Sequence, residues 1–293
     1  MIIGYVKNSD PQRALITYFE MRDGWRYASK CTFLVLIKGC GEIQDAKAGS
    51  ELHIHIAKRG LESDQFLGSS LIDMYAKCGS LVKARETFEK LPLKDVVSWN
   101  VLMGGYMSLG YDIEAIDCYK QMVSGGIIPS QASFLCGLKA CGSIQDVSKG
   151  QDTHKEIDRI GLLKSNHFIG GALVDMYVKC GFIQKAREVF DTLPIRTLFA
   201  WTALISGYAQ CGDGEEALKC FDHMIVEGIS PDAVTYICLL KACGVVGALS
   251  KGQVIHLEIS RAGILDQNLA LGNTLIDMYS KCGMLLKARN VFD

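Results

Sequence analysis

The chain has 293 residues, of which 49% are hydrophobic, so it can bury a large core and lacks the composition of a disordered protein. Its 31 basic and 32 acidic residues leave a net charge of −1, which excludes both the strongly basic surface of a non-specific nucleic-acid binder and a long acidic tail. With 5 prolines and 30 glycines, helix breakers are few and possible helix ends are many, which favours an all-helical fold.

The cysteine content and the apolar runs indicate a reduced, intracellular protein. The 12 cysteines are about 4% of the residues, well below the content of a disulfide scaffold. The N-terminal residues resemble neither a secretory signal peptide nor the Arg- and Ser-rich transit peptide of an organellar protein. The longest uncharged run, 197–212, is too short to span a bilayer. We therefore expect thiols rather than disulfides, and no membrane partner.

The dominant feature of the sequence is a repeat of 102 residues. Cys78, Cys180 and Cys282 are separated by this interval, as are three Asp-Met-Tyr triplets and three Lys-Ala-Arg triplets. Chance does not produce identical intervals at so many positions. The sequence is therefore an array of repeated structural units.

Each period divides into helical hairpins of 31, 35 and 36 residues. In 96–130, the residues Trp99, Leu102, Met103 and Tyr106 follow the spacing of one helix face, and a second helical pattern follows a glycine. One hairpin cannot bury its apolar faces alone, so we expect neighbours to stack into a superhelical α-solenoid. In chain order, the predicted units are 1–29 (partial), 30–64, 65–95, 96–130, 131–166, 167–197, 198–232, 233–268 and 269–293 (partial).

Two patterns resemble metal or catalytic sites but are better explained by helix packing. The His-x-Glu sequences at 154–156 and 256–258 match half of a zinc-deaminase signature, but the chain has no C-x-x-C sequence to complete the ligands. The C-x₄-C spacings at 136–141 and 238–243 recur at one repeat position, where a small apolar residue suits close packing. We therefore predict no catalytic residue, no metal and no cofactor.

The units resemble a known repeat family. The sequence VVSWNVLMGGYM in 96–130 is similar to the standard pentatricopeptide repeat of 35 residues. FLCGLKACGSIQDVSKGQDTH in 131–166 resembles its long variant, and ALVDMYVKCGFIQKAREVFDTLP in 167–197 its short variant. Their alternation is typical of the PLS subclass of plant pentatricopeptide repeat proteins, and the resemblance covers essentially the whole chain. It implies an all-α, right-handed superhelical solenoid that binds single-stranded RNA, one base per repeat.

The resemblance also implies which residues contact RNA. In the family, the fifth and last residues of a unit select the base, while the second residue packs against base faces. The implied pairs are Asn100 with Ser130 (cytosine), Thr202 with Asp232 (guanine) and Ser69 with Asp95 (guanine), and the stacking residues are Val97, Phe199 and Phe66. Lys77, Lys179 and Lys281 are either phosphate contacts or solvated surface charges.

Other units depart from this scheme. Gly171 with Thr197 matches no known pair, and Leu34, Leu135 and Ile237 at the fifth positions of the long units cannot hydrogen-bond a base. Units 131–166, 167–197 and 233–268 therefore carry no assigned base.

The resemblance implies that the chain specifies an editing or processing site in a mitochondrial or chloroplast transcript, with no DNA partner. The sequence contains no E/DYW extension of the kind that follows such repeats in editing factors, so we expect catalysis by a protein acting in trans. A scaffold for protein partners and a truncated product without function remain the alternatives. The polar pairs argue against the scaffold, because a peptide groove has no need of them.

Overall fold

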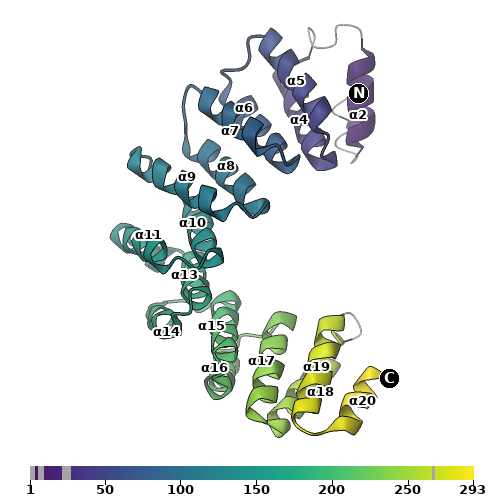
Figure 1. The fold of residues 1–293 in the computed structure, drawn as a ribbon, viewed down its shortest axis with the longest axis vertical. Helices are drawn as coiled ribbons and strands as arrows, with labels where there is room; N and C mark the ends of the chain where they lie inside the picture. The colour runs from purple at the N-terminus through teal and green to yellow at the C-terminus, as the bar shows by residue number, and fades with distance from the viewer. Residues whose placement is uncertain (1–3, 6–9, 22–27, 266–267) are drawn as a thin grey trace. The chain divides into compact units, whose positions relative to one another are not determined.

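The computed structural model describes residues 4–5, 10–21, 28–265 and 268–293, and in these ranges the regular secondary structure is helical, without strands (Figure 1). Two compact units are present, 1–140 and 141–293, with α10 (Gln131–Ser143) at their boundary. The first contains α2 (Pro11–Glu20), α4 (Lys30–Ile43), α5 (Ala46–Lys58), α6 (Gln65–Lys77), α7 (Leu81–Lys90), α8 (Val96–Ser108) and α9 (Asp112–Ser124). The second contains α11 (Val147–Ile160), α12 (Leu162–Ser165), α13 (His167–Lys179), α14 (Ile183–Thr192), α15 (Leu198–Gln210), α16 (Gly214–Val226), α17 (Ala233–Val246), α18 (Leu249–Arg261), α19 (Leu269–Lys281) and α20 (Leu285–Phe292).

Consecutive helices form hairpins, and the first helices of neighbouring hairpins pack on one another. In the first unit α6 contacts α4 and α8, and in the second α15 contacts α13 and α17, while α7, α9, α14 and α16 pack against their own first helices. Figure 1 shows this pairing in each unit. The prediction of an all-α solenoid of stacked hairpins is confirmed.

Each first helix begins where a side chain of the preceding residue caps it. Asp95 accepts a hydrogen bond from the Ser98 backbone N–H at 2.8 Å, and Asp232 accepts one from the Thr235 N–H at 2.8 Å. Such caps satisfy backbone donors that have no partner inside the helix. Side chains of the same type cap other first helices: Asp64, Asn166, Thr197 and Asn268.

Aromatic contacts join successive hairpins inside the core. Trp99 lies edge-on to Phe88 with ring centroids 4.5 Å apart, and Trp201 meets Phe190 at the same distance. All four side chains are buried. Because these pairs link the second helix of one hairpin to the first helix of the next, they fix the stacking of the array.

The histidines of the His-x-Glu sequences also lie at hairpin junctions. His154 Nδ1 is 2.9 Å from Tyr177 Oη, and His256 Nδ1 is 2.9 Å from Tyr279 Oη. His53 makes the equivalent bond to Tyr75 at 3.0 Å. Burial lowers the pKa of each of these histidines. A neutral ring held by a tyrosine of the next hairpin is a packing element.

Two adjacent glycines of α8 differ in how closely the preceding hairpin approaches them. A Cβ at Gly105 would lie 2.5 Å from Ala76 Cβ of α6, whereas a Cβ at Gly104 would have no heavy atom of the described residues within 4 Å beyond its chain neighbours and the backbone of its own helix. We expect Gly105→Ala to lower the free energy of unfolding by about 1–3 kcal/mol through overpacking. Gly104→Ala should raise it by about 0.5–1 kcal/mol, because alanine favours the helix. Denaturant titration of both variants measures the difference, and equal stabilities would contradict the observed approach of α6 and α8.

The histidine–tyrosine bonds predict a pH dependence of stability. Because folding lowers the pKa of His256 below its ordinary value, the unfolded chain binds a proton more readily as the pH falls through about 6.5. The free energy of unfolding should therefore decrease between pH 7.5 and pH 5.5. His256→Gln removes one of these titrating groups and should make the decrease smaller. Urea titrations at the two pH values test this, and a decrease as large as that of the parent would refute it.

Candidate nucleic-acid interface

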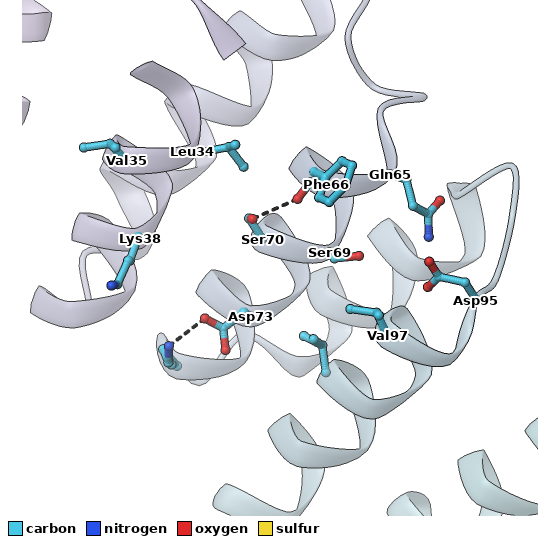
Figure 2. Close-up of a pocket in the computed structure, with 12 residues that line it drawn as sticks. Leu34, Val35, Lys38, Gln65, Phe66, Ser69, Ser70, Asp73, Asp95 and Val97 are labelled. Atoms are coloured by element: carbon cyan, nitrogen blue, oxygen red, sulfur yellow. Dashed lines mark hydrogen bonds and ion pairs between the residues drawn. The ribbon is translucent and has the colours of Figure 1, made fainter. Parts of the chain in front are cut away.

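The first helices of the first unit border a groove of about 540 Å³ (Figure 2). Phe66 at the start of α6 and Val97 at the start of α8 line it, and both side chains are exposed, Phe66 to 71%. Ser69 and Asp95 line the same groove, and Figure 2 shows Ser69 on α6 directed to the side where Val97 and Asp95 lie. The groove thus combines exposed apolar surface with polar groups that have unused hydrogen-bonding capacity.

The second compact unit, 141–293, carries side chains of the same kinds at the corresponding positions. Phe199 at the start of α15 and Val234 at the start of α17 are 51% and 55% exposed. Thr202 is half-buried and Asp232 is exposed. In both compact units, therefore, the apolar side chain at the second position of these first helices remains in solvent. A side chain that served core packing would be buried.

The structure brings Asn100 and Ser130 together. The Asn100 amide nitrogen donates to Ser130 Oγ at 3.0 Å, and the hydroxyl of Ser133 donates to the Asn100 amide oxygen at 2.7 Å. Ser133 is completely buried. Its part in this cluster was not predicted, because it belongs to the next unit. The signal in the sequence is a hydroxyl on the core-facing side of an otherwise apolar helix.

Thr202 and Asp232 are linked through a third residue. Thr202 Oγ1 is 2.7 Å from Thr235 Oγ1, and Thr235 donates from its hydroxyl to Asp232 Oδ1, also at 2.7 Å. Thr235 is completely buried, like Ser133. Its part in this cluster was not predicted either, because Thr235 also belongs to the next unit.

The remaining predicted pairs differ from these two. Within the described part of the chain the Ser69 hydroxyl has no hydrogen-bond partner, although Ser69 and Asp95 line one groove. A Cβ at residue 171 would lie 2.8 Å from Phe199 Cδ1, so that position has little room for a longer side chain. Gly171 itself has no side chain to pair with Thr197, so 167–197 forms no polar pair like those of Asn100 and Thr202.

The three lysines proposed for phosphate contacts each have an acidic neighbour. Lys77, Lys179 and Lys281 lie 2.6 to 2.7 Å from the aspartate carboxylate four residues earlier. Nearly half of each lysine side chain remains exposed. Exposed pairs of this kind stabilise a fold only slightly. The lysine charge is therefore partly compensated before any phosphate arrives, and a phosphate contact at these positions stays a prediction.

The cysteines lie at packing positions rather than in metal sites. The described residues, which include every cysteine, contain no disulfide and no group of three metal-binding side chains. Burial raises the pKa of Cys40 and Cys243 to about 12. Burial also raises the pKa of Cys118 to about 11, although the Arg85 guanidinium, which donates to its sulfur at 3.4 Å, opposes this rise. Thiols with such pKa values are poor nucleophiles.

None of the helices in the described ranges is both long and apolar enough to cross a bilayer.

Sequence comparison decides the family. A model described as "PPR repeat family" matches residues 196–244, and one described as "PPR repeat" matches 1–24, 69–96, 97–127, 171–194 and 273–293. A mitochondrial pentatricopeptide repeat-containing protein of Arabidopsis thaliana is 34% identical over 292 residues. The chain belongs to the pentatricopeptide repeat family. That alignment covers 100% of this chain and 28% of the relative.

Other relatives from the same plant are similarly close. A chloroplastic pentatricopeptide repeat-containing protein is 34% identical over 281 residues, covering 96% of this chain and 45% of the relative. Another pentatricopeptide repeat-containing protein is 33% identical over 300 residues, covering 100% and 53%. The chain thus spans about half or less of the length of these relatives.

Solved structures match the fold. The pentatricopeptide repeat protein PPR10, in complex with an 18-nucleotide psaJ RNA element, aligns with a TM-score of 0.70 at 16% identity. The alignment covers 99% of this chain and 48% of PPR10. PPR10 from maize aligns with a TM-score of 0.54, at the same identity. At this identity the match establishes the helical-repeat fold of the chain.

The burial of the cysteines predicts the order in which they react. Cys31 and Cys211 are exposed, whereas Cys40, Cys118 and Cys243 are buried and have raised pKa values. We expect a thiol reagent at pH 7.5 to modify the two exposed cysteines first and the three buried ones only on unfolding. Mass spectrometry of digested samples maps the sites over time. Early modification of the buried residues, or a disulfide in the reduced protein, would be inconsistent with this packing.

Proposed function

We propose that this chain binds single-stranded RNA and selects its sequence through the paired polar residues of its groove. The observation that supports this most is the repeated combination of an exposed apolar second residue with a polar pair. Bases stack on apolar or aromatic side chains irrespective of sequence, and polar groups beside the stack select their edges. With a net charge of −1, the chain depends on such contacts more than on a general attraction to phosphate.

The proposed stacking residues are Phe66, Val97 and Phe199, and the proposed reading pairs are Ser69/Asp95, Asn100/Ser130 and Thr202/Asp232. The unit boundaries that we propose are those predicted from the sequence, and the alternation of standard, long and short units supports the proposed assignment to the PLS subclass. With RNA running 5′ to 3′ from the N- to the C-terminal unit, the preferred core is 5′-G-C-N-N-G-3′. The two unassigned bases face units 131–166 and 167–197.

The biological role that we propose is the marking of an editing or processing site in an organellar transcript. The mitochondrial and chloroplastic names of the relatives support an organelle as the location. The chain itself is proposed to have no catalytic activity, and the reaction is assigned to a protein in trans.

Replacing Asp232 tests base selection. A carboxylate accepts hydrogen bonds from the ring N–H and the amine of guanine, whereas an amide can also donate to the ring nitrogen of adenine. We expect Asp232→Asn to shift the preference at that base from G towards A by about 1–3 kcal/mol. The fold should persist, because asparagine caps a helix as well as aspartate does. Gel-shift titrations with G and A oligonucleotides at one salt concentration measure the shift.

A matched control is Asp213→Asn. Asp213 caps α16 by accepting from the Glu216 N–H at 3.3 Å, so this variant makes the same change of charge and cap on a second helix. It should leave the ranking of G and A unchanged. If Asp232→Asn and the parent rank the two oligonucleotides identically, Asp232 does not read that base.

A further inference from the structure

The Thr202–Asp232 pair is held by a buried hydroxyl that belongs to neither residue. Thr235 Oγ1 lies 2.7 Å from both Thr202 Oγ1 and Asp232 Oδ1, and the Thr235 backbone N–H reaches the same carboxylate oxygen at 2.8 Å. Thr235 is 0% exposed, so it cannot itself touch a base. Any influence on RNA must pass through the two residues that it joins.

The hydrogens of this cluster have only one consistent arrangement. A carboxylate has no hydrogen to donate, so the single hydroxyl hydrogen of Thr235 goes to Asp232 Oδ1. The short contact between the two threonines then requires Thr202 to donate to Thr235. Thr202 has no hydrogen left and can offer a base only lone pairs. Asp232 also offers only lone pairs, so both groups are acceptors.

The hydrogens around Asn100 are arranged differently. Ser133 donates to the Asn100 oxygen, which leaves the Ser130 hydroxyl to donate to Ser133 at 3.1 Å. Ser130 Oγ accepts from the Asn100 amide and from the Ser133 backbone N–H, so its two lone pairs and its hydrogen are all used. Asn100 keeps one N–H and one lone pair. Asn100 alone therefore presents both a donor and an acceptor to RNA, and Ser130 presents neither.

We infer that Thr235 and Ser133, each the third residue of the unit after its reading pair, are specificity-determining residues, because their buried hydroxyls fix which hydrogen-bonding groups the pair presents to RNA. The inference rests on the proposed function and deepens it. Thr235 leaves Thr202 and Asp232 with acceptors only, and these match the two adjacent donors on the Watson–Crick edge of guanine. Ser133 leaves Asn100 with a donor and an acceptor, which matches the acceptor and donor of cytosine.

The distribution of these residues along the chain supports the inference. The third residue of the next unit is Ser or Thr in the three complete units whose fifth residue is polar, and it is apolar in the other four. The first group comprises Ser69 with Ser98, Asn100 with Ser133 and Thr202 with Thr235. The second comprises Leu34 with Leu67, Leu135 with Ile169, Gly171 with Ala200 and Ile237 with Leu271.

The pair Ser69/Asp95 supplies an internal control, because Ser98, the third residue of the unit that follows it, occupies the same place as Thr235 without forming the bridge. The Ser98 hydroxyl donates to the backbone carbonyl of Asp95 at 2.9 Å and not to its carboxylate. Ser98 is buried as completely as Thr235. Removing the Ser98 hydroxyl changes the third residue of a first helix, as a substitution of Thr235 does, but it frees no hydrogen-bonding group of Ser69 or of the Asp95 carboxylate.

The test compares Thr235→Val, Thr235→Ser and Ser98→Ala in the full chain. The affinity of the parent and of each variant is measured for 5′-G-C-N-N-G-3′ RNA, with either G or A at the base under study, at one salt concentration. We expect Thr235→Val to reduce the G-to-A affinity ratio at the last base about three- to tenfold, the value of one hydrogen bond. The reason is that the released Thr202 hydroxyl can then donate to the ring nitrogen of adenine. Thr235→Ser should keep the parent ratio, and Ser98→Ala should keep the ratio at the first base.

The outcomes separate this inference from the proposed function. A parent chain that shows no base preference overturns both. If the parent prefers G and a folded Thr235→Val variant has the same G-to-A affinity ratio, the inference alone is overturned. It is also overturned if Thr235→Ser loses the preference for G as Thr235→Val does. Circular dichroism establishes folding. If Thr235→Val does not fold, Ser133→Ala tests the same role, because a released Asn100 amide can flip and should discriminate C from U about three- to tenfold less well. An unchanged C-to-U ratio then refutes the inference.

Discussion

The N-terminus of a helix exposes backbone N–H groups that need acceptors, and in this array the last residue of one hairpin supplies an acceptor to the next. Aspartate, asparagine, serine and threonine are the side chains that do this best. The same four side chains carry the donors and acceptors that distinguish base edges. Asp95 and Asp232 each engage one carboxylate oxygen, Oδ1, with the helix. The requirement for a cap thus places a polar side chain at the boundary between successive hairpins of the described residues.

Under the proposed function, capping also explains why some hairpins carry no reading pair. Asp64 caps α6 with Oδ1, and its other oxygen, Oδ2, is 2.6 Å from Lys30 Nζ. Its partner at the fifth position is Leu34, which cannot form a hydrogen bond. A cap whose second oxygen is occupied and whose neighbour is apolar is purely structural. Whether a cap can also serve recognition is therefore decided by the residues around it.

The sequence predicted most of the fold because the fold depends on local periodicity. The spacing of Trp99, Leu102 and Met103 identified a helix face, and all three side chains are buried. The contacts within the site could be predicted only in part. The link between Thr202 and Thr235 spans 33 residues of sequence, and the direction of a hydroxyl hydrogen follows only from the distances of a complete cluster. The pairing of Lys77 with Asp73 was not predicted either, although the two are four residues apart on one helix.

The bonds of His53, His154 and His256 to tyrosine recur at intervals of 101 or 102 residues, each between one hairpin and the next. A gene segment that encodes three hairpins therefore carries matched surfaces at both of its ends. Unequal crossing-over between two such segments would insert or delete whole blocks without creating an unmatched junction. If each hairpin corresponds to one nucleotide, the recognised site would lengthen or shorten by three positions in a single genetic event. Under the proposed function, the array could in this way acquire a new RNA target before any single side chain that faces the RNA is altered.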